Sequence, residues 1–206
     1  MIGRKIAIIV EGQTERVFKE ALLKFLKTRL SQMPKLQFIT YNGRIPKQEK
    51  LKRVVENLLE EVDHVIALTD VFTGPVTRTL PDFINAEDAK SKMRRWVGDD
   101  PRFHPHAAQH DFEAWLLPYW SKIQKIARHN KNAPSGPPES IDHNKPPAYY
   151  IQDIFEIGGC RKSYVKPRDA KVILNGEDLM VAIRACPELK AFINTIISAC
   201  EGDVIP

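Results

Sequence analysis

Acidic residues follow the apolar segments of this chain, although the sequence carries a formal net charge of +5. Glu11 comes directly after the run IAIIV, Glu15 follows four residues later, and Asp70 comes directly after HVIALT. Glu113 lies in the segment HDFEAW. Carboxylates held within a few ångströms of one another repel and raise their own pKa values, unless a divalent cation compensates. Carboxylate oxygens suit Mg²⁺ or Mn²⁺, ions that commonly bind phosphates, and we therefore expect Glu11, Asp70 and Glu113 to hold such an ion for phosphate chemistry.

Each acid also has a plainer explanation. A carboxylate in the first turn of a helix is often a surface residue favoured by the helix dipole, which would account for Glu15 and Glu113. Asp70 would then terminate its strand or cap a turn. Glu11 fits this explanation less well, because Gly12 follows it and allows another group to approach closely. The joint placement of Glu11 and Asp70 at equivalent strand ends favours the metal site.

The hydrophobic pattern predicts the elements that position these acids. Short apolar runs predict buried strands over residues 5–10, 36–41 and 64–69, with a short fourth strand over 107–109. Helices are expected between them, and Asp111 is expected to cap a helix over 112–120. This alternation predicts an α/β fold with a mainly parallel sheet flanked by helices. The carboxyl ends of parallel strands lie at one edge, where ligands bind, so the acids should meet there.

A Pro-rich segment divides the 206 residues into parts. It contains NAPSGPPESIDHNKPP and is expected to be a loop. We predict an α/β domain over residues 1–130, the loop over 131–147, and a C-terminal helical extension over 148–206 that packs on the domain.

Composition narrows the function classes. The sequence pI of about 9.1 mildly favours an anionic partner such as nucleic acid. Basic residues concentrate in 15–30 and 161–171, although solvated faces explain these equally well. No apolar run is long enough to cross a membrane, and the three widely spaced cysteines suit a reduced, cytoplasmic location. Zinc binding by His104, His106 and His110 is a weaker alternative, since no cysteine or paired helical spacing supports it.

Six segments of the chain resemble a known family in the same order: VEGQTE, ALTDVF, HDFEAWLL, APSGPPESID, YVK and CPELKAFI. The first two are similar to the Toprim fold, which topoisomerases, bacterial primases and OLD-type nucleases share. The whole set resembles a family of small Toprim-like proteins of unassigned function, often encoded beside ATPases and linked to defence against phage. The resemblance implies a Mg²⁺-dependent nuclease that acts on DNA or RNA. It also implies an ATPase partner and a role in defence against phage.

The resemblance also implies roles for individual residues. Glu11 would be a metal ligand or general acid/base, Asp70 a metal ligand, and Glu15 a supporting catalytic residue. Toprim enzymes usually carry D-x-D at the third strand, whereas Phe72 occupies the second acidic position here. From the topology, we expect Glu113 to supply the missing carboxylate.

Three further residues complete the predicted site. His110 is expected to carry a proton or contact phosphate. Lys166, in the family element YVK, would clamp the scissile phosphate or stabilise the leaving oxygen. Arg44 follows the second strand and its Asn-Gly turn, which places it at the same edge. The substitution at Phe72 favours an alternative function, a non-catalytic Toprim-fold adaptor or binding subunit of an ATPase complex.

Overall fold

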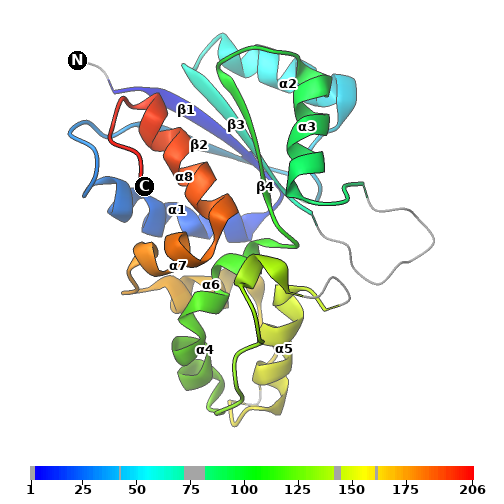
Figure 1. Ribbon diagram of the computed structural model, residues 1–206, viewed down its shortest axis with the longest axis vertical. Coiled ribbons are helices and arrows are strands. Elements are labelled where there is room, and N and C mark those ends of the chain that lie inside the picture. The colour runs from blue at the N-terminus through cyan, green and yellow to red at the C-terminus, as the bar shows by residue number, and fades with distance from the viewer. Residues whose placement is uncertain (1–2, 42, 72–81, 142–144, 161) are drawn as a thin grey trace.

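The computed structural model describes residues 3–41, 43–71, 82–141, 145–160 and 162–206. Its strands form a parallel sheet in the order β2-β1-β3-β4 (Figure 1). The strands are β1 (Lys5–Val10), β2 (Lys35–Thr40), β3 (His64–Asp70) and β4 (Phe103–Ala108). This architecture confirms the mainly parallel α/β sheet expected from the sequence.

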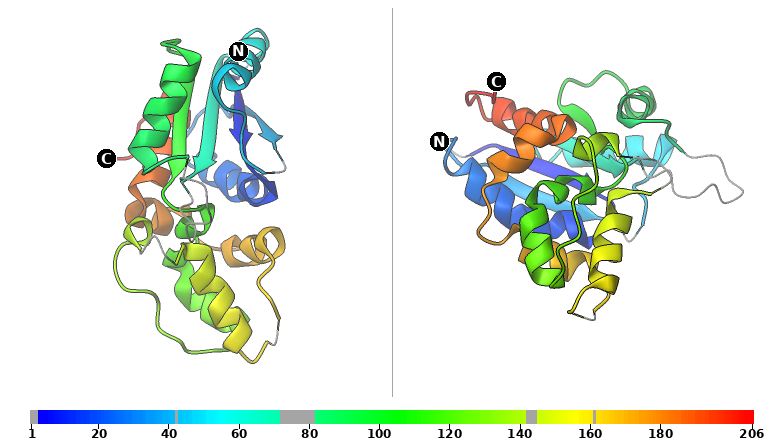
Figure 2. Two further views of the ribbon diagram at one scale, coloured as in Figure 1. Left: turned by 90° about the vertical axis from the view of Figure 1, so that its right-hand side faces the viewer. Right: turned by 60° about the horizontal axis from the view of Figure 1, so that its bottom comes forward.

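Helices cover both faces of the sheet (Figure 1 and Figure 2). Helices α2 (Gln48–Leu59) and α3 (Ala86–Val97) pack on one face, and α1 (Gln13–Leu26) and α8 (Pro187–Ala199) pack on the other. The remaining helices are α4 (Trp120–Ala127), α5 (Pro147–Ile157), α6 (Lys166–Leu174) and α7 (Leu179–Ala185). Of these, α4, α5 and α6 lie beyond the carboxyl ends of the strands. Within the described part of the chain, no helix is both long enough and apolar enough to cross a bilayer.

Strand β1 is buried on both faces because it is central and each face carries a helical layer. Ile6, Ile8 and Val10 join the core beneath α1 and α8, while Ala7 and Ile9 join the core beneath α2 and α3. Such a strand needs apolar residues at every position rather than at alternate ones. This explains the continuous run that ends at the first acid.

The C-terminal helices share their core with the sheet. Trp115 is 1% exposed, and its ring centroid lies 5.9 Å from that of Phe18 in α1 and 6.0 Å from that of Phe192 in α8. These aromatic contacts join α1, the segment after β4, and α8 into one apolar cluster. The chain after the Pro-rich segment is therefore packed directly against the N-terminal layers.

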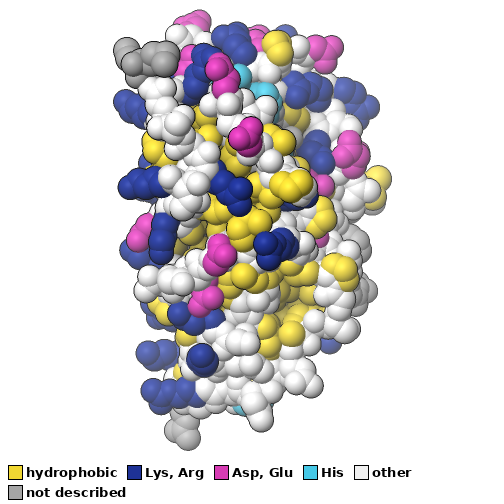
Figure 3. Space-filling model, turned by 60° about the vertical axis from the view of Figure 1, so that its left-hand side comes forward, with side chains coloured by type: hydrophobic (Ala, Val, Ile, Leu, Met, Phe, Trp, Pro, Cys, Tyr) yellow, Lys and Arg dark blue, Asp and Glu magenta, His cyan; other side chains and the backbone are white. Residues whose placement is uncertain are grey.

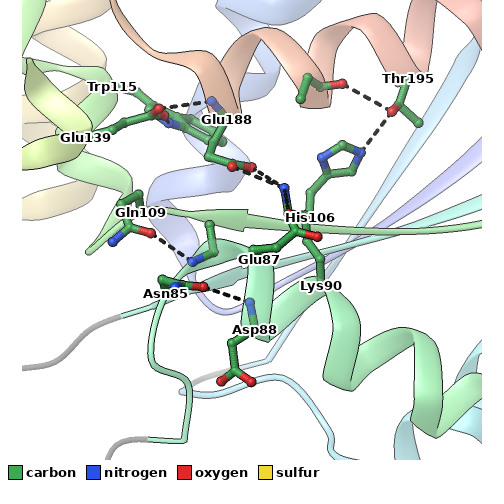
Figure 4. Close-up of polar contacts among 12 residues, drawn as sticks. Asn85, Glu87, Asp88, Lys90, His106, Gln109, Trp115, Glu139, Glu188 and Thr195 are labelled. Atoms are coloured by element: carbon green, nitrogen blue, oxygen red, sulfur yellow. Dashed lines mark hydrogen bonds and ion pairs between the residues drawn. The ribbon is translucent and has the colours of Figure 1, made fainter.

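Polar contacts tie α8 to both sides of the edge strand β4 (Figure 4). The Nε2 atom of His106 in β4 lies 2.9 Å from the hydroxyl of Thr195 in α8. The ammonium of Lys90 in α3 lies 3.1 Å from the carboxylate of Glu188 at the start of α8. The backbone N–H of Glu188 also donates to the buried Glu139 carboxylate at 3.0 Å. These contacts hold α3 and α8 together around the edge of the sheet.

Strand β4 is longer than the sequence pattern indicates. The expected strand covered residues 107–109, whereas β4 begins at Phe103 and ends at Ala108. Pro105 in its middle obscures the pattern, because proline cannot donate a ladder hydrogen bond. An edge strand tolerates proline because one side of its backbone has no strand partner.

The helix predicted over residues 112–120 is wrong. The segment forms two 3₁₀ turns, η1 (Phe112–Trp115) and η2 (Leu117–Tyr119), and α4 then begins at Trp120. Pro118 interrupts a continuous α-helix because it lacks an N–H and disfavours the α conformation at the preceding residue. The Asp111 side chain makes no cap hydrogen bond to this segment. Its carboxylate is therefore available for other contacts.

Replacing Phe192 with alanine tests the shared core. Phe192 is 1% exposed and contacts the rings of Trp115 and His106, so Phe192→Ala is expected to lower the free energy of unfolding by about 3–5 kcal/mol. Urea unfolding followed by tryptophan fluorescence and far-ultraviolet circular dichroism measures this loss. The control Val181→Ala, on the exposed side of α7, is expected to change it by no more than about 0.5 kcal/mol. Two separate transitions for sheet and C-terminal helices would contradict a shared core.

Candidate metal centre at the carboxyl edge of the sheet

Glu11 and Asp70 meet at the ends of neighbouring strands. Glu11 directly follows β1, and Asp70 is the last residue of β3, which pairs with β1 in parallel. The Oε1 atom of Glu11 accepts hydrogen bonds from the Thr69 hydroxyl and from the backbone N–H of Asp70, the latter at 3.2 Å. The Glu11 carboxylate is thus held against the end of β3, as the predicted site requires.

Glu15 is buried rather than lying on the surface. It occupies the first turn of α1 and is 5% exposed. Its Oε2 lies over Gly12, 3.4 Å from the position that a Cβ atom at Gly12 would take. Burial, together with the nearby charges of Glu11 and Glu113, raises the pKa of Glu15 to about 7. This removes the explanation of Glu15 as a surface acid that merely complements the helix dipole.

Asp70 has acidic neighbours from three segments of the chain. Burial raises its pKa well above the ordinary value, and the charges of Glu15, Glu11, Asp111 and Glu113 each raise it further. These five residues, which we name the carboxylate cluster, come from the end of β1, the start of α1, the end of β3 and the segment after β4. The parallel topology therefore brings the predicted strand-end acids into one electrostatic group.

Glu113 is paired with two side chains from the C-terminal part of the chain. It is 1% exposed, and its carboxylate accepts from the Tyr164 hydroxyl at 3.2 Å and from the Lys166 ammonium at 3.0 Å. Burial alone would lower the pKa of Lys166, but the charges of Glu113, Asp111 and Asp70 raise it above its ordinary value. Lys166 therefore faces the carboxylate cluster, where the sequence predicted a basic residue.

Asp111 belongs to the cluster, although the sequence pattern indicated a helix cap. It is 3% exposed; its Oδ2 accepts from the backbone N–H of Ala148 at 3.2 Å, and its buried Oδ1 has no hydrogen-bond partner in the described part of the chain. Burial, together with the charge of Glu113, raises the pKa of Asp111 to about 8. The spacing D-x-E shortly after β4 was the available signal, because Asp111 and Glu113 both lie in the turn that follows that strand.

Three other residues named in the sequence analysis, His110, Arg44 and Phe72, differ in what the structure shows of them. His110 is 1% exposed, with a φ of 71° directly before Asp111, and its role as a proton carrier stays a prediction. Arg44 forms an ion pair with Asp82 at 2.6 Å, and its charge lowers the pKa of Glu11 against the larger effect of burial. Phe72 lies outside the described residues.

The donor chemistry of the cluster suits Mg²⁺ or Mn²⁺, because every candidate ligand is a carboxylate oxygen. Across the described residues, however, no three or more His, Cys, Asp or Glu side chains are already arranged to hold a metal ion. The zinc grouping of His104, His106 and His110 is therefore not formed either. Instead, Lys166 and raised carboxyl pKa values balance the charge of the cluster. The unpartnered oxygen of Asp111 and the gathered carboxylates are consistent with an ion that would draw the ligands together.

Metal-free protein is expected to lose stability as the pH rises from about 5 to about 9. The pKa values of Asp111 and Glu15 are about 8 and about 7 in the folded protein, and both lie near 4 in an unfolded chain. The folded state therefore binds more protons in this interval, and the stability they contribute is lost as the pH passes through 7 and 8. Urea unfolding in EDTA at several pH values measures the slope.

The variant Asp111→Asn separates this effect from general pH sensitivity. It is expected to flatten the slope and to exceed the stability of the wild type by about 1–3 kcal/mol at a pH of about 9. Asp203→Asn, at an exposed position near the C-terminus, should retain the slope of the wild type. Equal slopes for the wild type and Asp111→Asn would contradict a buried, protonated Asp111.

Comparison with solved structures first defines the class of fold. The chain is similar to the C-terminal region of the Burkholderia pseudomallei OLD protein, with a TM-score of 0.54 and 14% sequence identity over 97% of this chain and 100% of that chain. At this identity the likeness establishes a shared α/β fold. The family described as "Domain of unknown function (DUF4276)" matches residues 10–197, and the chain belongs to that family. A search of curated proteins finds no match to the chain.

Proposed function

We propose that the protein is a metal-dependent nuclease of the Toprim type, which hydrolyses phosphodiester bonds of DNA or RNA with Mg²⁺ or Mn²⁺. The observation that carries this proposal is the carboxylate cluster facing Lys166 at the carboxyl edge of a parallel sheet. Acids that raise one another's pKa values are costly to the fold, and such arrangements concentrate at functional sites. The fold shared with the OLD C-terminal region supports the same proposal.

The side chains have distinct proposed roles. Glu11, Asp70 and Glu113 hold the ion, and the unpartnered oxygen of Asp111 supplies a further ligand atom. When bound, Mg²⁺ or Mn²⁺ polarises the phosphate and activates a water molecule. Glu15, whose pKa is about 7, is suited to accept a proton from that water near neutral pH.

Lys166 is proposed to exchange partners when substrate binds. Its ammonium is 3.0 Å from Glu113, yet its side chain is 49% exposed and can turn toward a phosphate. With Glu113 engaged as a ligand, the Lys166 ammonium would be free to hold the scissile phosphate or the leaving oxygen. His110, adjacent to Asp111 in the chain, is proposed to relay a proton.

A basic surface beside the cluster is proposed to bind the nucleic-acid backbone. Helices α1 and α6 pack against each other and carry exposed basic side chains: Arg16 and Lys24 on α1, Lys27 directly after it, and Lys166, Arg168 and Lys171 on α6. Lysine and arginine side chains line one side of the molecular face in Figure 3. Contacts of this kind release counterions, so binding should weaken as salt rises.

A cleavage assay tests the activity directly. Purified protein is incubated with single- and double-stranded DNA, RNA and tRNA in the presence of Mg²⁺ or Mn²⁺. We expect cleavage that EDTA abolishes and that Glu11→Gln or Asp70→Asn reduces about 100-fold or more. Glu56→Gln, on the exposed face of α2, is the matched control and should cleave like the wild type. No cleavage of any substrate, or undiminished cleavage by both site variants, would refute the assignment.

Two lysines on α6 distinguish catalysis from backbone binding. Lys166→Ala is expected to lower kcat about 100-fold, because its ammonium acts on the reacting phosphate. Lys171→Ala, on the exposed side of the same helix, is expected to raise KM with little change in kcat and to reduce the salt dependence of binding. Steady-state kinetics at several salt concentrations measure both. Equal effects of the two substitutions on kcat would exclude a specific role for Lys166.

The alternative proposal is a non-catalytic adaptor or binding subunit of an ATPase complex. Two observations favour it: no three-ligand group is formed within the described residues, and Lys166 already occupies Glu113. In either case the proposed setting is phage defence with an ATPase partner. Calorimetry with Mn²⁺ separates the two functions, because an adaptor would associate stably with an ATPase while binding no divalent ion at the carboxylate cluster.

A further inference from the structure

A pair of histidines lies where the strands begin, at the end of the sheet opposite to the carboxylate cluster. His64 begins β3, and His104 is the second residue of β4. Because Ile66 is the residue paired with His104, the two histidines share one face of the sheet on a diagonal. The Nδ1 atom of His64 lies 3.1 Å from the Nε2 atom of His104, and their ring centroids are 5.3 Å apart.

The separation of these nitrogens matches that of two ligands on a single metal ion. Zinc binds imidazole nitrogen at about 2.0–2.1 Å, which places two nitrogens about 3.3 Å apart in a tetrahedral site. Both side chains are partly exposed, and histidine side chains reach the surface near the top of Figure 3. A cation from solvent can therefore reach the pair without opening the core.

Both rings are neutral near pH 7, as metal ligation requires. Burial, together with the charges of His64 and Arg94, lowers the pKa of His104 to about 4. Burial also lowers the pKa of His64, and Arg4 lowers it further. Each ring therefore presents one nitrogen lone pair and one N–H.

The charged side chains around His64 include more acids than bases. His64 lines a surface cavity of about 510 Å³ together with Glu60, Glu61, Asp63, Arg4 and Arg102. Each arginine of the cavity is paired with an acid, Arg4 with Glu201 at 2.7 Å and Arg102 with Asp100 at 2.8 Å, so their positive charge is partly offset. Glu60 and Glu61 are exposed and form no ion pair with any described residue, so they leave negative charge in the cavity.

The neighbouring histidine does not belong to this pair. His106 lies on the same face of β4, but it is 7% exposed, and its Nε2 contacts Thr195 of α8 at 2.9 Å (Figure 4). A site formed here would therefore have two protein ligands, with its remaining positions open to water or to a carboxylate of the cavity.

We propose that His64 and His104 together bind a divalent transition-metal ion of the Zn²⁺ class. Imidazole nitrogen selects zinc, copper or nickel over Mg²⁺, so this site is chemically distinct from the carboxylate cluster and does not depend on the proposed nuclease function. In the absence of metal, one of the two rings donates its N–H to the facing nitrogen of the other. On metal binding that proton moves through solvent to the other nitrogen of the same ring, so both facing lone pairs reach the ion and no net proton is released. The bound ion ties the edge strand β4 to β3.

Zinc titration in the presence of excess Mg²⁺ tests the proposal, since Mg²⁺ occupies carboxylate sites and leaves imidazoles free. The first readout is the ring-nitrogen resonances of ¹⁵N-histidine-labelled wild-type protein. Zn²⁺ is expected to shift Nδ1 of His64 and Nε2 of His104, whereas Mg²⁺ alone should shift neither. Because this measurement uses the wild type, it does not depend on whether a variant folds.

Calorimetry of variants supplies the second readout. His64→Asn and His104→Asn are each expected to weaken Zn²⁺ binding about tenfold or more. His129→Asn, at a partly exposed histidine after α4, is the matched control and should bind like the wild type. The proposal is overturned if neither ring shifts with Zn²⁺, if His104→Asn binds as tightly as the wild type, or if His129→Asn is the variant that loses binding.

Discussion

Electrostatic repulsion within the carboxylate cluster is the constraint on which the rest of this structure depends. Glu11, Asp70 and Asp111 come from the ends of β1 and β3 and from the segment after β4, and burial raises the pKa of each carboxyl group. The fold compensates in three ways. The backbone at the end of β3 donates to Glu11, raised pKa values keep protons on buried carboxyls, and Lys166 places its ammonium against Glu113. A fold that keeps such a cluster retains a local cost that a bound cation would relieve.

The compensation comes largely from the C-terminal part of the chain. Tyr164 and Lys166 contact Glu113, and the backbone N–H of Ala148 contacts Asp111, although all three follow the Pro-rich segment. The C-terminal helices are therefore more than a cover for one face of the sheet. They supply the hydrogen-bond donors and the positive charge that a cluster of buried acids requires. The aromatic contact between Trp115 and Phe192 packs α8 against the 3₁₀ turn that carries Glu113.

The two edges of the sheet carry different donor atoms. The carboxyl edge gathers oxygen ligands, and the amino edge holds two imidazole nitrogens, His64 and His104. Hard cations such as Mg²⁺ prefer the first kind of donor, and zinc-class ions prefer the second. β3 contributes to both edges, with His64 at its start and Asp70 at its end. The proposed sites would thus select different ions by chemistry rather than by competition.

The sequence alone indicated the three apolar strands, their parallel arrangement and the end of the sheet where the acids collect, because buried central strands must be apolar at every position and carboxyl ends of parallel strands must coincide. The extent of β4 needed the structure, because Pro105 obscures the pattern of that edge strand. The sequence also singled out Glu11, Asp70, Glu113 and Lys166, which the structure brings near one another. Only the tertiary structure decided that Asp111 is a buried member of the cluster, since a cap and a ligand look alike in sequence until the path of the turn is known. The pairing of His64 with His104 was equally hidden, because it depends on the register of two strands about forty residues apart in the chain, which no local pattern encodes.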